Sequence, residues 1–174
     1  SGGFTDCLLK RGAALVHAVD SGSNQMHGRL RADPRVRLRE KTNIMAVDRL
    51  DPEPDFAVCD LSFRSLRGAA RHIAGLTRSG TAFALVKPQF EWRNPPAAFD
   101  GVVRGENDLE KILTDLAASL EEEGLRVADA AESPVRGRSG NREFFFLLET
   151  GLPGNSDGGV GIREKIRSLV RGSV

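Results

Sequence analysis

The segment Thr81-Ala-Phe-Ala-Leu-Val86, followed directly by Lys87 and Pro88, is the stretch of sequence that decides the fold. Its mostly apolar residues predict a β-strand. Pro88 has no backbone N–H to donate and cannot continue a ladder, so the chain leaves the sheet at this point. The lysine therefore stands at the tip of a strand, where a charge needs a polar environment.

Two acidic residues stand at comparable positions. Asp60 follows the apolar run Phe56-Ala-Val-Cys59, and Glu143 precedes the run Phe144-Phe-Phe-Leu-Leu148. Burying an unpaired charge costs several kcal/mol, so such residues belong at strand tips and not inside strands. In an open α/β sheet, ligands bind at the edge formed by the carboxyl ends of the strands. We therefore expect Asp60, Lys87 and Glu143 to share one site.

Strands and helices alternate along most of the chain, which predicts an α/β fold with a mostly parallel sheet. Besides the three strands above, we expect strands at 14–19, 36–39 and 125–130, helices at 5–11, 24–30, 65–76, 106–123 and 162–170, and a long irregular loop at 90–105. The last two strands are joined by the loop 133–141 without a helix, so they should run antiparallel. That places Glu143 on the same edge as the ends of the parallel strands.

The chain of 174 residues has the size of one domain, which we place at 1–150, followed by a linker and a short helix at 151–174. With 40% hydrophobic and 28% charged residues, the composition is globular, and no apolar run is long enough to span a membrane. Cys7 and Cys59 lack a metal-ligand spacing, which favours reduced thiols and a cytoplasmic protein. The three histidines are scattered, so no metal site is expected.

A net charge of +1 does not by itself indicate a nucleic-acid-binding protein, but the arginines are clustered. The cluster at 29–41 is best interpreted as the solvated faces of helices and strands. Arg136, Arg138 and Arg142 instead lie in or beside a glycine-rich loop next to Glu143. At that place guanidinium groups would suit contacts with phosphate.

The first residues contain the parts of a nucleotide-cofactor site. Ser1, Gly2 and Gly3 precede a predicted helix, and the next predicted strand ends at Asp20. Glycines at a helix start let a ligand approach the backbone, and an acid at a strand tip can accept hydrogen bonds from ribose hydroxyls. A glycine pair in an ordinary loop and an acid that caps a helix would give the same pattern.

Six segments strengthen this interpretation: Gly3-Phe-Thr-Asp-Cys7, Ala18-Val-Asp20, Cys59-Asp-Leu-Ser-Phe63, Leu85-Val-Lys-Pro-Gln-Phe90, Gly101-Val-Val-Arg104 and Gly140-Asn-Arg-Glu-Phe144. In these segments the chain resembles the haemolysin A type (TlyA) RNA methyltransferases of the FtsJ-like family. The resemblance implies a Rossmann-like sheet with an antiparallel last strand. It also implies S-adenosylmethionine as cofactor and methylation of a ribose 2′-hydroxyl in ribosomal RNA or the ribosomal subunit, at cytidine.

Members of this family use a lysine-aspartate-lysine-glutamate set, in which Asp60 matches the aspartate, Lys87 the second lysine and Glu143 the glutamate. A lysine held close to a ribose hydroxyl can lower the pKa of that hydroxyl or take its proton. The resemblance also places these residues at the cofactor: Ser1, Gly2, Gly3, Asp20, Gln25, Asn43 and Asp60. Arg104 joins the arginines of the 136–142 segment as an expected RNA contact.

The sequence also departs from the family. In family members a central first strand, the first catalytic lysine and an S4 RNA-binding domain all precede the position of residue 1. Without the first strand, the sheet should split between the strand that ends at Asp20 and the strand that ends at Asp60. We therefore expect an N-terminally incomplete methyltransferase domain that is inactive as it stands.

Two other functions compete with methyl transfer. The haemolysin name suggests a membrane-damaging protein, although the sequence has no long amphipathic or membrane-spanning segment. A module that binds RNA or cofactor without catalysis is the other alternative. Replacing Lys87 separates them, because only a methyltransferase should lose turnover while it keeps its affinity for the cofactor.

Overall fold

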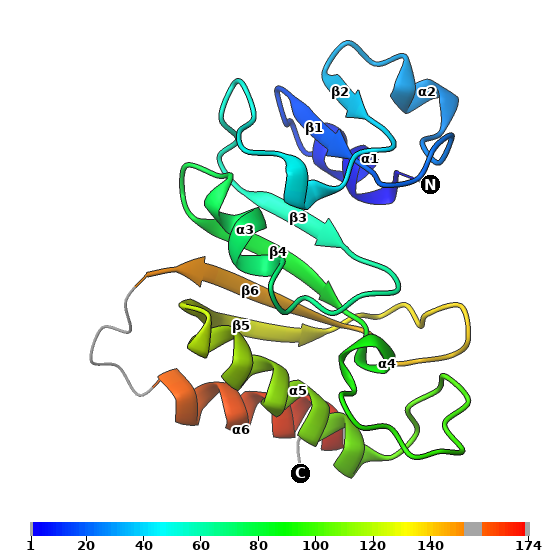
Figure 1. Cartoon of the computed structure of the whole chain (residues 1–174), viewed down its shortest axis with the longest axis vertical. Coiled ribbons are helices and arrows are strands. Elements are labelled where there is room, and N and C mark those ends of the chain that lie inside the picture. The colour runs from blue at the N-terminus through cyan, green and yellow to red at the C-terminus, as the bar shows by residue number, and fades with distance from the viewer. Residues whose placement is uncertain (1, 152–157, 173–174) are drawn as a thin grey trace. The chain divides into compact units, whose positions relative to one another are not determined.

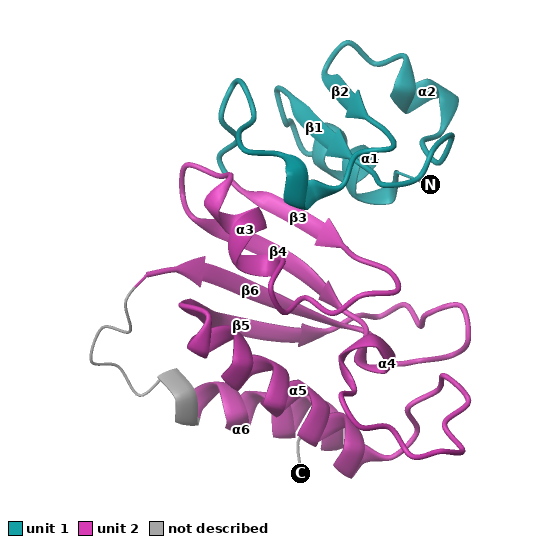
Figure 2. Cartoon of the chain, in the orientation of Figure 1, with its two compact units in different colours: residues 1–55 teal, residues 56–174 magenta. Residues whose placement is uncertain are grey.

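The computed structural model of the chain describes residues 2–151 and 158–172 (Figure 1). The chain forms two compact units, residues 1–55 and 56–174, which Figure 2 shows in teal and magenta. Unit 1 contains a two-stranded sheet and unit 2 a four-stranded sheet. Within the described residues, no strand of one sheet pairs with a strand of the other. The two sheets are thus separated between the strand before Asp20 and the strand that ends at Asp60, where a split of the sheet was expected.

Unit 1 is built from short elements around a small core. They are α1 (Gly3–Lys10), β1 (Val16–Val19), α2 (Gly28–Arg31), β2 (Val36–Arg39) and the 3-10 helix η1 (Ile44–Ala46). β1 and β2 pair in parallel, with Val16 opposite Val36. The side chains of Leu9, Val16 and Leu30 are buried together and hold the two helices to the strands.

The expected helix at 24–30 is wrong over its first half. Asn24 has a φ of 56°, in the left-handed region, which an α-helix cannot include. Helix α2 begins only at Gly28, because the ring of His27 accepts a hydrogen bond from the N–H of Arg29 and so caps the helix. The apolar spacing alone did not indicate this start.

Unit 2 carries the rest of the fold. Its elements are β3 (Ala57–Asp60), α3 (Ala70–Gly75), β4 (Thr81–Val86), α4 (Pro88–Glu91), α5 (Glu106–Glu122), β5 (Leu125–Glu132), β6 (Phe144–Thr150) and α6 (Gly158–Arg171). The strand order is β3-β4-β6-β5. β3 and β4 are parallel, whereas β6 is antiparallel to both of its neighbours. The predicted α/β class with an antiparallel last strand is therefore confirmed.

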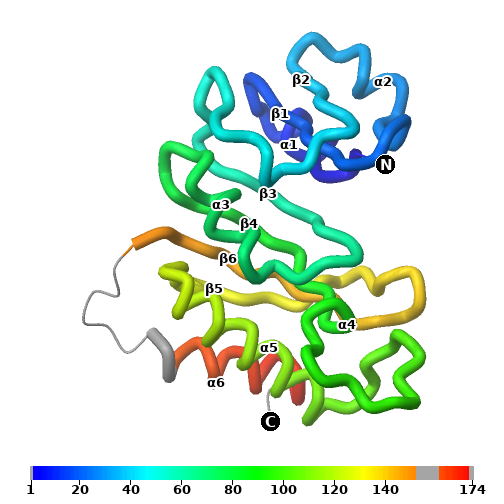
Figure 3. Tube along the Cα trace, in the orientation of Figure 1, coloured from blue at the N-terminus to red at the C-terminus, as the bar shows by residue number. Residues whose placement is uncertain are grey.

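The core of unit 2 follows the two periods of the sequence. Phe144, Phe146 and Leu148 alternate along β6 and are fully buried. Along α5, the apolar residues at helical spacing are buried as predicted: Leu109, Ile112, Leu113, Leu116 and Leu120. Helix α3 packs on β4 and β6, while α5 and α6 pack on β5 and on each other, as the chain path in Figure 3 shows. Helix α6 is thus part of unit 2.

Two further expectations need correction in unit 2. The helix expected at 65–76 is only α3, because Gly68 has a φ of 72° and donates its N–H to the carboxylate of Glu123. The loop expected at 90–105 is entered through α4, in which Pro88 occupies the first turn, where a missing N–H costs nothing. Most of the expected linker, residues 152–157, lies outside the described residues.

Several other features of the described residues bear on function. None of their helices combines the length and the apolar character needed to cross a membrane. Both cysteines are free thiols. Cys59 is buried in β3, and its burial, together with the neighbouring charge of Asp60, raises the pKa of its thiol to about 12. It is therefore a neutral core residue at neutral pH.

Candidate active site

Asp60 and Lys87 meet at the carboxyl ends of two parallel strands. Asp60 ends β3 and lies opposite Leu85 of β4, and Lys87 follows the last residue of β4. The Lys87 Nζ atom lies 2.5 Å from Asp60 Oδ1 and donates a hydrogen bond to Ser62 Oγ at 3.0 Å. The lysine side chain is only 13% exposed and that of the aspartate 44%, so the ammonium group depends on these two partners.

Glu143 reaches the same edge because β6 runs in the opposite direction. Val86, the last residue of β4, lies opposite Phe144, the first residue of β6. Lys87 and Glu143 are the next residues outward on these adjacent strands. The structure therefore brings Asp60, Lys87 and Glu143 together at one edge of the sheet, while their catalytic roles stay predictions.

The electrostatics of Glu143 reflect this crowded edge. Burial raises the pKa of its carboxyl group, the ammonium of Lys87 lowers it, and the carboxylate of Asp60 raises it further. The net shift is upward, so the carboxyl group holds its proton more readily than an exposed glutamate does. Its Oε1 atom would lie 2.6 Å from a Cβ at position 137, so a larger residue there would displace the carboxylate of Glu143. Gly137 thus allows a close approach of the loop to the acid.

Sequence reasoning did not select Ser62 and Phe63 as site residues. Ser62 accepts the hydrogen bond from Lys87, and Phe63 has a φ of 61° and is 90% exposed. Such backbone strain in a bulky residue costs about 1–3 kcal/mol and tends to occur at functional sites. The Phe63 ring lies 5.4 Å from that of Phe90, centroid to centroid. The Asp-x-Ser-Phe pattern was the available signal.

A buried carboxylate ties the lysine-bearing segment to the segment that carries Ser62. Glu91, the last residue of α4, is 4% exposed. It accepts hydrogen bonds from Ser65 Oγ at 2.5 Å and the N–H of Leu66 at 2.8 Å, and it pairs with Arg67 at 3.0 Å. Burial raises the pKa of Glu91, and these three partners counteract that shift. Because α4 starts directly after Lys87, this tether limits how far the lysine can move.

Asn141 forms a second tether, also missed by sequence reasoning. This residue is 3% exposed, and its Oδ1 accepts the N–H of Val103 at 2.9 Å while its Nδ2 donates to the carbonyl of Gly101 at 2.8 Å. A side-chain amide that bonds to a backbone N–H and a backbone C=O in this way takes the place of a neighbouring strand. It joins the end of the long loop to the segment just before Glu143.

The start of unit 1 has the backbone features of a ligand-binding turn. Gly2 has a φ of 100° and precedes α1, whose first N–H groups have no side-chain cap. The positive φ favours glycine, and a Cβ at this position would also lie 2.7 Å from the sulfur of Met26 and displace that side chain. Gly3 begins α1, and Ser1 lies outside the described residues.

The other predicted cofactor residues of unit 1 stand in turns. Asp20 accepts the N–H of Gly22 at 2.7 Å, and Asn43 accepts the N–H of Met45 at 3.0 Å and caps η1. The Gln25 amide donates to a backbone carbonyl two residues earlier at 3.2 Å. Each side chain thus orders its own loop, and its contact with a cofactor stays a prediction.

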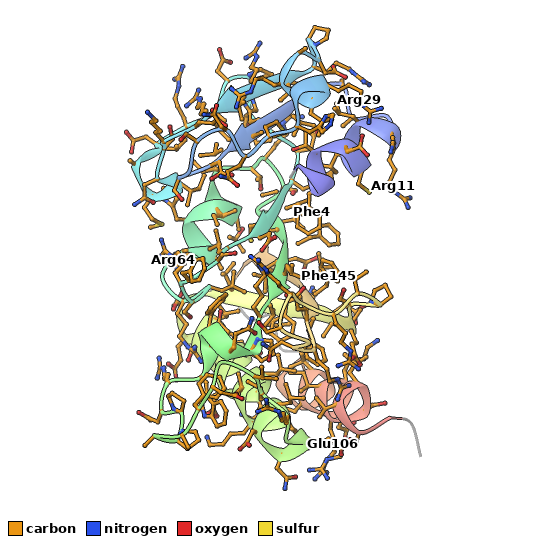
Figure 4. The ribbon with its side chains drawn as sticks, turned by 90° about the vertical axis from the view of Figure 1, so that its right-hand side faces the viewer. Phe4, Arg11, Arg29, Arg64, Glu106 and Phe145 are labelled. Atoms are coloured by element: carbon orange, nitrogen blue, oxygen red, sulfur yellow. The ribbon has the colours of Figure 1, made fainter. Side chains whose placement is uncertain are left out.

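The arginines differ in how much of their charge is compensated. Arg29, Arg31 and Arg35 of the first cluster each pair with a nearby carboxylate. Figure 4 shows Arg11 and Arg29 of unit 1 and Arg64 of unit 2 extending outward from the ribbon. The structure agrees with the interpretation of the first cluster as a solvated face.

Among the predicted RNA contacts, Arg104 and Arg136 have exposed side chains, and Arg138 is also exposed. Arg104 pairs with Asp100 at 2.7 Å. Arg142 differs, because its side chain is only 18% exposed and it bonds to groups within unit 2. In the part of the chain that the structure describes, no three His, Cys, Asp or Glu residues gather as a metal site.

Known proteins are similar to most of this chain. The family model for FtsJ-like methyltransferases matches residues 1–150. The chain is 37% identical over 153 residues to the 16S/23S rRNA (cytidine-2′-O)-methyltransferase TlyA of Mycobacterium tuberculosis, covering 86% of this chain and 57% of the relative. It is 36% identical over 149 residues to Hemolysin A of Brachyspira hyodysenteriae, covering 83% and 62%. The chain thus spans less than two thirds of the length of each relative.

A solved structure is similar in fold as well as in sequence. It is that of a Streptococcus thermophilus protein named as a candidate hemolysin, with a TM-score of 0.84 and 37% identity. The match covers 96% of this chain and 62% of the other. The similarity therefore extends over both units and includes the segments that carry Asp60, Lys87 and Glu143.

Replacing Asn141 with alanine should destabilise the protein by about 1–3 kcal/mol, because the buried N–H of Val103 and the part-buried C=O of Gly101 lose their partner. The free energy of unfolding in urea measures this. Asn94→Ala, at an exposed position of the long loop, is the matched control and should change it by less than about 0.5 kcal/mol. Equal effects of the two substitutions would contradict the assignment of Asn141 as a tether.

Replacing Glu143 with glutamine should raise the free energy of unfolding at pH 7 more than at pH 4. The pKa of Glu143 in the folded protein is above its ordinary value of 4.5, so its contribution to stability falls as the pH rises from that value through the folded pKa. Glutamine removes this loss. Chemical denaturation at both pH values measures the free energy of unfolding, with Glu121→Gln on the surface of α5 as the control. A gain in this free energy that is smaller at pH 7 than at pH 4 would contradict the prediction.

Proposed function

Because this chain belongs to the FtsJ-like methyltransferase family, we propose that it methylates a ribose 2′-hydroxyl of ribosomal RNA, at cytidine, with S-adenosylmethionine as the methyl donor. The observation that carries the proposal is the contact of Lys87 with Asp60 and Ser62 beside Glu143. The relative TlyA of M. tuberculosis is named for the same reaction. A ribosomal substrate implies that the protein acts in the cytoplasm.

Lys87 has the central role in this proposal. A ribose hydroxyl is a poor nucleophile near neutral pH, and an ammonium group beside it stabilises the developing alkoxide. Asp60 and Ser62 occupy two of the three N–H groups of the Lys87 ammonium, so the third is left for the substrate. Glu143, whose pKa is raised by burial and by the charge of Asp60, orients the hydroxyl and takes its proton as the oxygen attacks the sulfonium methyl group and S-adenosylhomocysteine leaves.

S-adenosylmethionine supplies a methyl group already activated on a sulfonium centre, so the reaction needs no metal. The residues of unit 1 fit such a ligand by their chemistry. The uncapped N–H groups at the start of α1 and Gly2 before it suit a polar ligand close to the backbone. Asp20, Gln25 and Asn43 offer the carboxylate and amide groups that nucleoside hydroxyls and amines require.

RNA contacts would come from the exposed groups of unit 2. Arg104, Arg136 and Arg138 are exposed, and guanidinium groups bind phosphate in a bidentate way. The ring of Phe63 is 90% exposed and follows Ser62 directly, so it offers a face on which an unpaired base can stack near the lysine. A substrate nucleotide in a single-stranded or flipped state fits this arrangement best.

Replacing Lys87 with alanine in the complete gene product should reduce methyl transfer to ribosomal RNA by at least about 100-fold, because the group that activates the hydroxyl is lost. The dissociation constant for S-adenosylmethionine should change by less than about twofold. Transfer of a labelled methyl group measures the first quantity and calorimetry the second.

Lys111→Ala is the matched control, because Lys111 lies on the exposed face of α5 and pairs with Asp115 in the same helix. It should leave both quantities unchanged. Mass spectrometry of the product nucleosides locates the methyl group. Full turnover by the Lys87 variant, or a methyl group on a base instead of a ribose oxygen, would overturn the proposed function.

A further inference from the structure

The guanidinium group of Arg142 connects the last turn of α6 to the segment that contains Glu143. It donates hydrogen bonds to the carbonyl oxygens of Leu169 and Val170, both at 2.8 Å. The last carbonyls of a helix have no partner within the helix and carry partial negative charge, so a cation bound there satisfies both needs. Helix α6 therefore ends against the residue that precedes Glu143.

The same guanidinium joins α6 to β5 and β6. Its Nε and Nη2 atoms donate to the two carboxylate oxygens of Glu132, at 2.8 and 2.6 Å, and its central carbon lies 5.5 Å from the centre of the Phe144 ring. Four of its five N–H groups are thus used inside unit 2. In agreement, the hydrogen bonds to Glu132 raise the pKa of Arg142. The guanidinium group therefore links parts of unit 2 to one another.

Glu143 itself is fixed on the other side. Its carbonyl accepts the N–H of Ser133, next to the end of β5, and its carboxylate lies against Gly137. The direction of a side chain follows from the position of its backbone, and that backbone is held between Arg142 and Ser133. A displacement of about 1 Å at a reacting group can lower a rate by about 100-fold. The arginine is thus placed to control the geometry of the acid.

We propose that Arg142 is a positioning residue for Glu143, and that α6 acts through it as a brace of the active site instead of a separate tail. This inference rests on the proposed methyl transfer, in which Glu143 orients the ribose hydroxyl. It also assigns Arg142 a role different from that of an RNA contact, since at most one of its N–H groups is left for phosphate.

The test compares Arg142→Gln and Arg142→Lys in the complete gene product. Glutamine removes the fork, and lysine keeps the charge but cannot bind the carboxylate and both carbonyls at once. We expect kcat to fall at least tenfold in both variants, with the KM for RNA and the dissociation constant for S-adenosylmethionine within twofold of wild type. If the glutamine variant does not fold, the lysine variant tests the inference.

Arg171→Gln is the matched control, because Arg171 anchors the same helix, to Glu110 and Asn107 of α5, without contacting the Glu143 segment. It should leave kcat within twofold of wild type. Unchanged kcat in the Arg142 variants, or an equal fall in the Arg171 variant, would overturn the inference. A higher KM for RNA with unchanged kcat would instead identify Arg142 as an RNA contact.

A second readout does not depend on turnover. A carbon-13 NMR titration of the Glu143 carboxyl group reports its distance from the charges that face it, Lys87 and Asp60. Its midpoint should shift in both Arg142 variants and stay at the wild-type value in Arg171→Gln; an unshifted midpoint would overturn the inference. If the wild-type protein transfers no methyl group, the proposed function fails, while this titration still decides whether Arg142 positions the acid.

Discussion

The contact between Lys87 and Asp60 is the interaction on which the rest of the site depends. The Lys87 side chain is only 13% exposed, so its ammonium group requires partners, and it finds them only because β3 and β4 are parallel and end at the same edge. The antiparallel direction of β6 then adds Glu143 to that edge. Sheet topology, not local sequence, thus creates a cluster of two acids and a base.

Three connections hold this cluster in place, and each joins segments that are distant in sequence. Glu91 ties the lysine segment to the loop after Asp60, and Asn141 ties the long loop to the segment before Glu143. Arg142 ties that segment to the end of α6. Each connection relies on a polar side chain with little exposure, for which unpaired donors or acceptors would be costly. Rigidity at the site therefore comes from buried polar groups.

The sequence predicted what depends on local pattern. The apolar runs beside Asp60, Lys87 and Glu143 gave the strands, and the absence of a helix before Glu143 gave the antiparallel direction. The prediction failed where the φ angle of a single residue sets the start of a helix, as at Asn24 and Gly68, which shorten two expected helices. It did not indicate the partners of Glu91, Asn141 and Arg142, because those partners lie on other elements, and nothing in the sequence indicates which polar residues will be buried.

The central claim is that Asp60 and Lys87 act as one unit on the ribose hydroxyl. Its most direct test is a double-mutant cycle, in which single-turnover methyl transfer is measured for Asp60→Asn, Lys87→Ala and the double variant. Residues that act as a unit give strongly non-additive losses. The account predicts that the double variant is about as slow as the slower single variant. Losses that multiply would show that the two residues act independently and would contradict it.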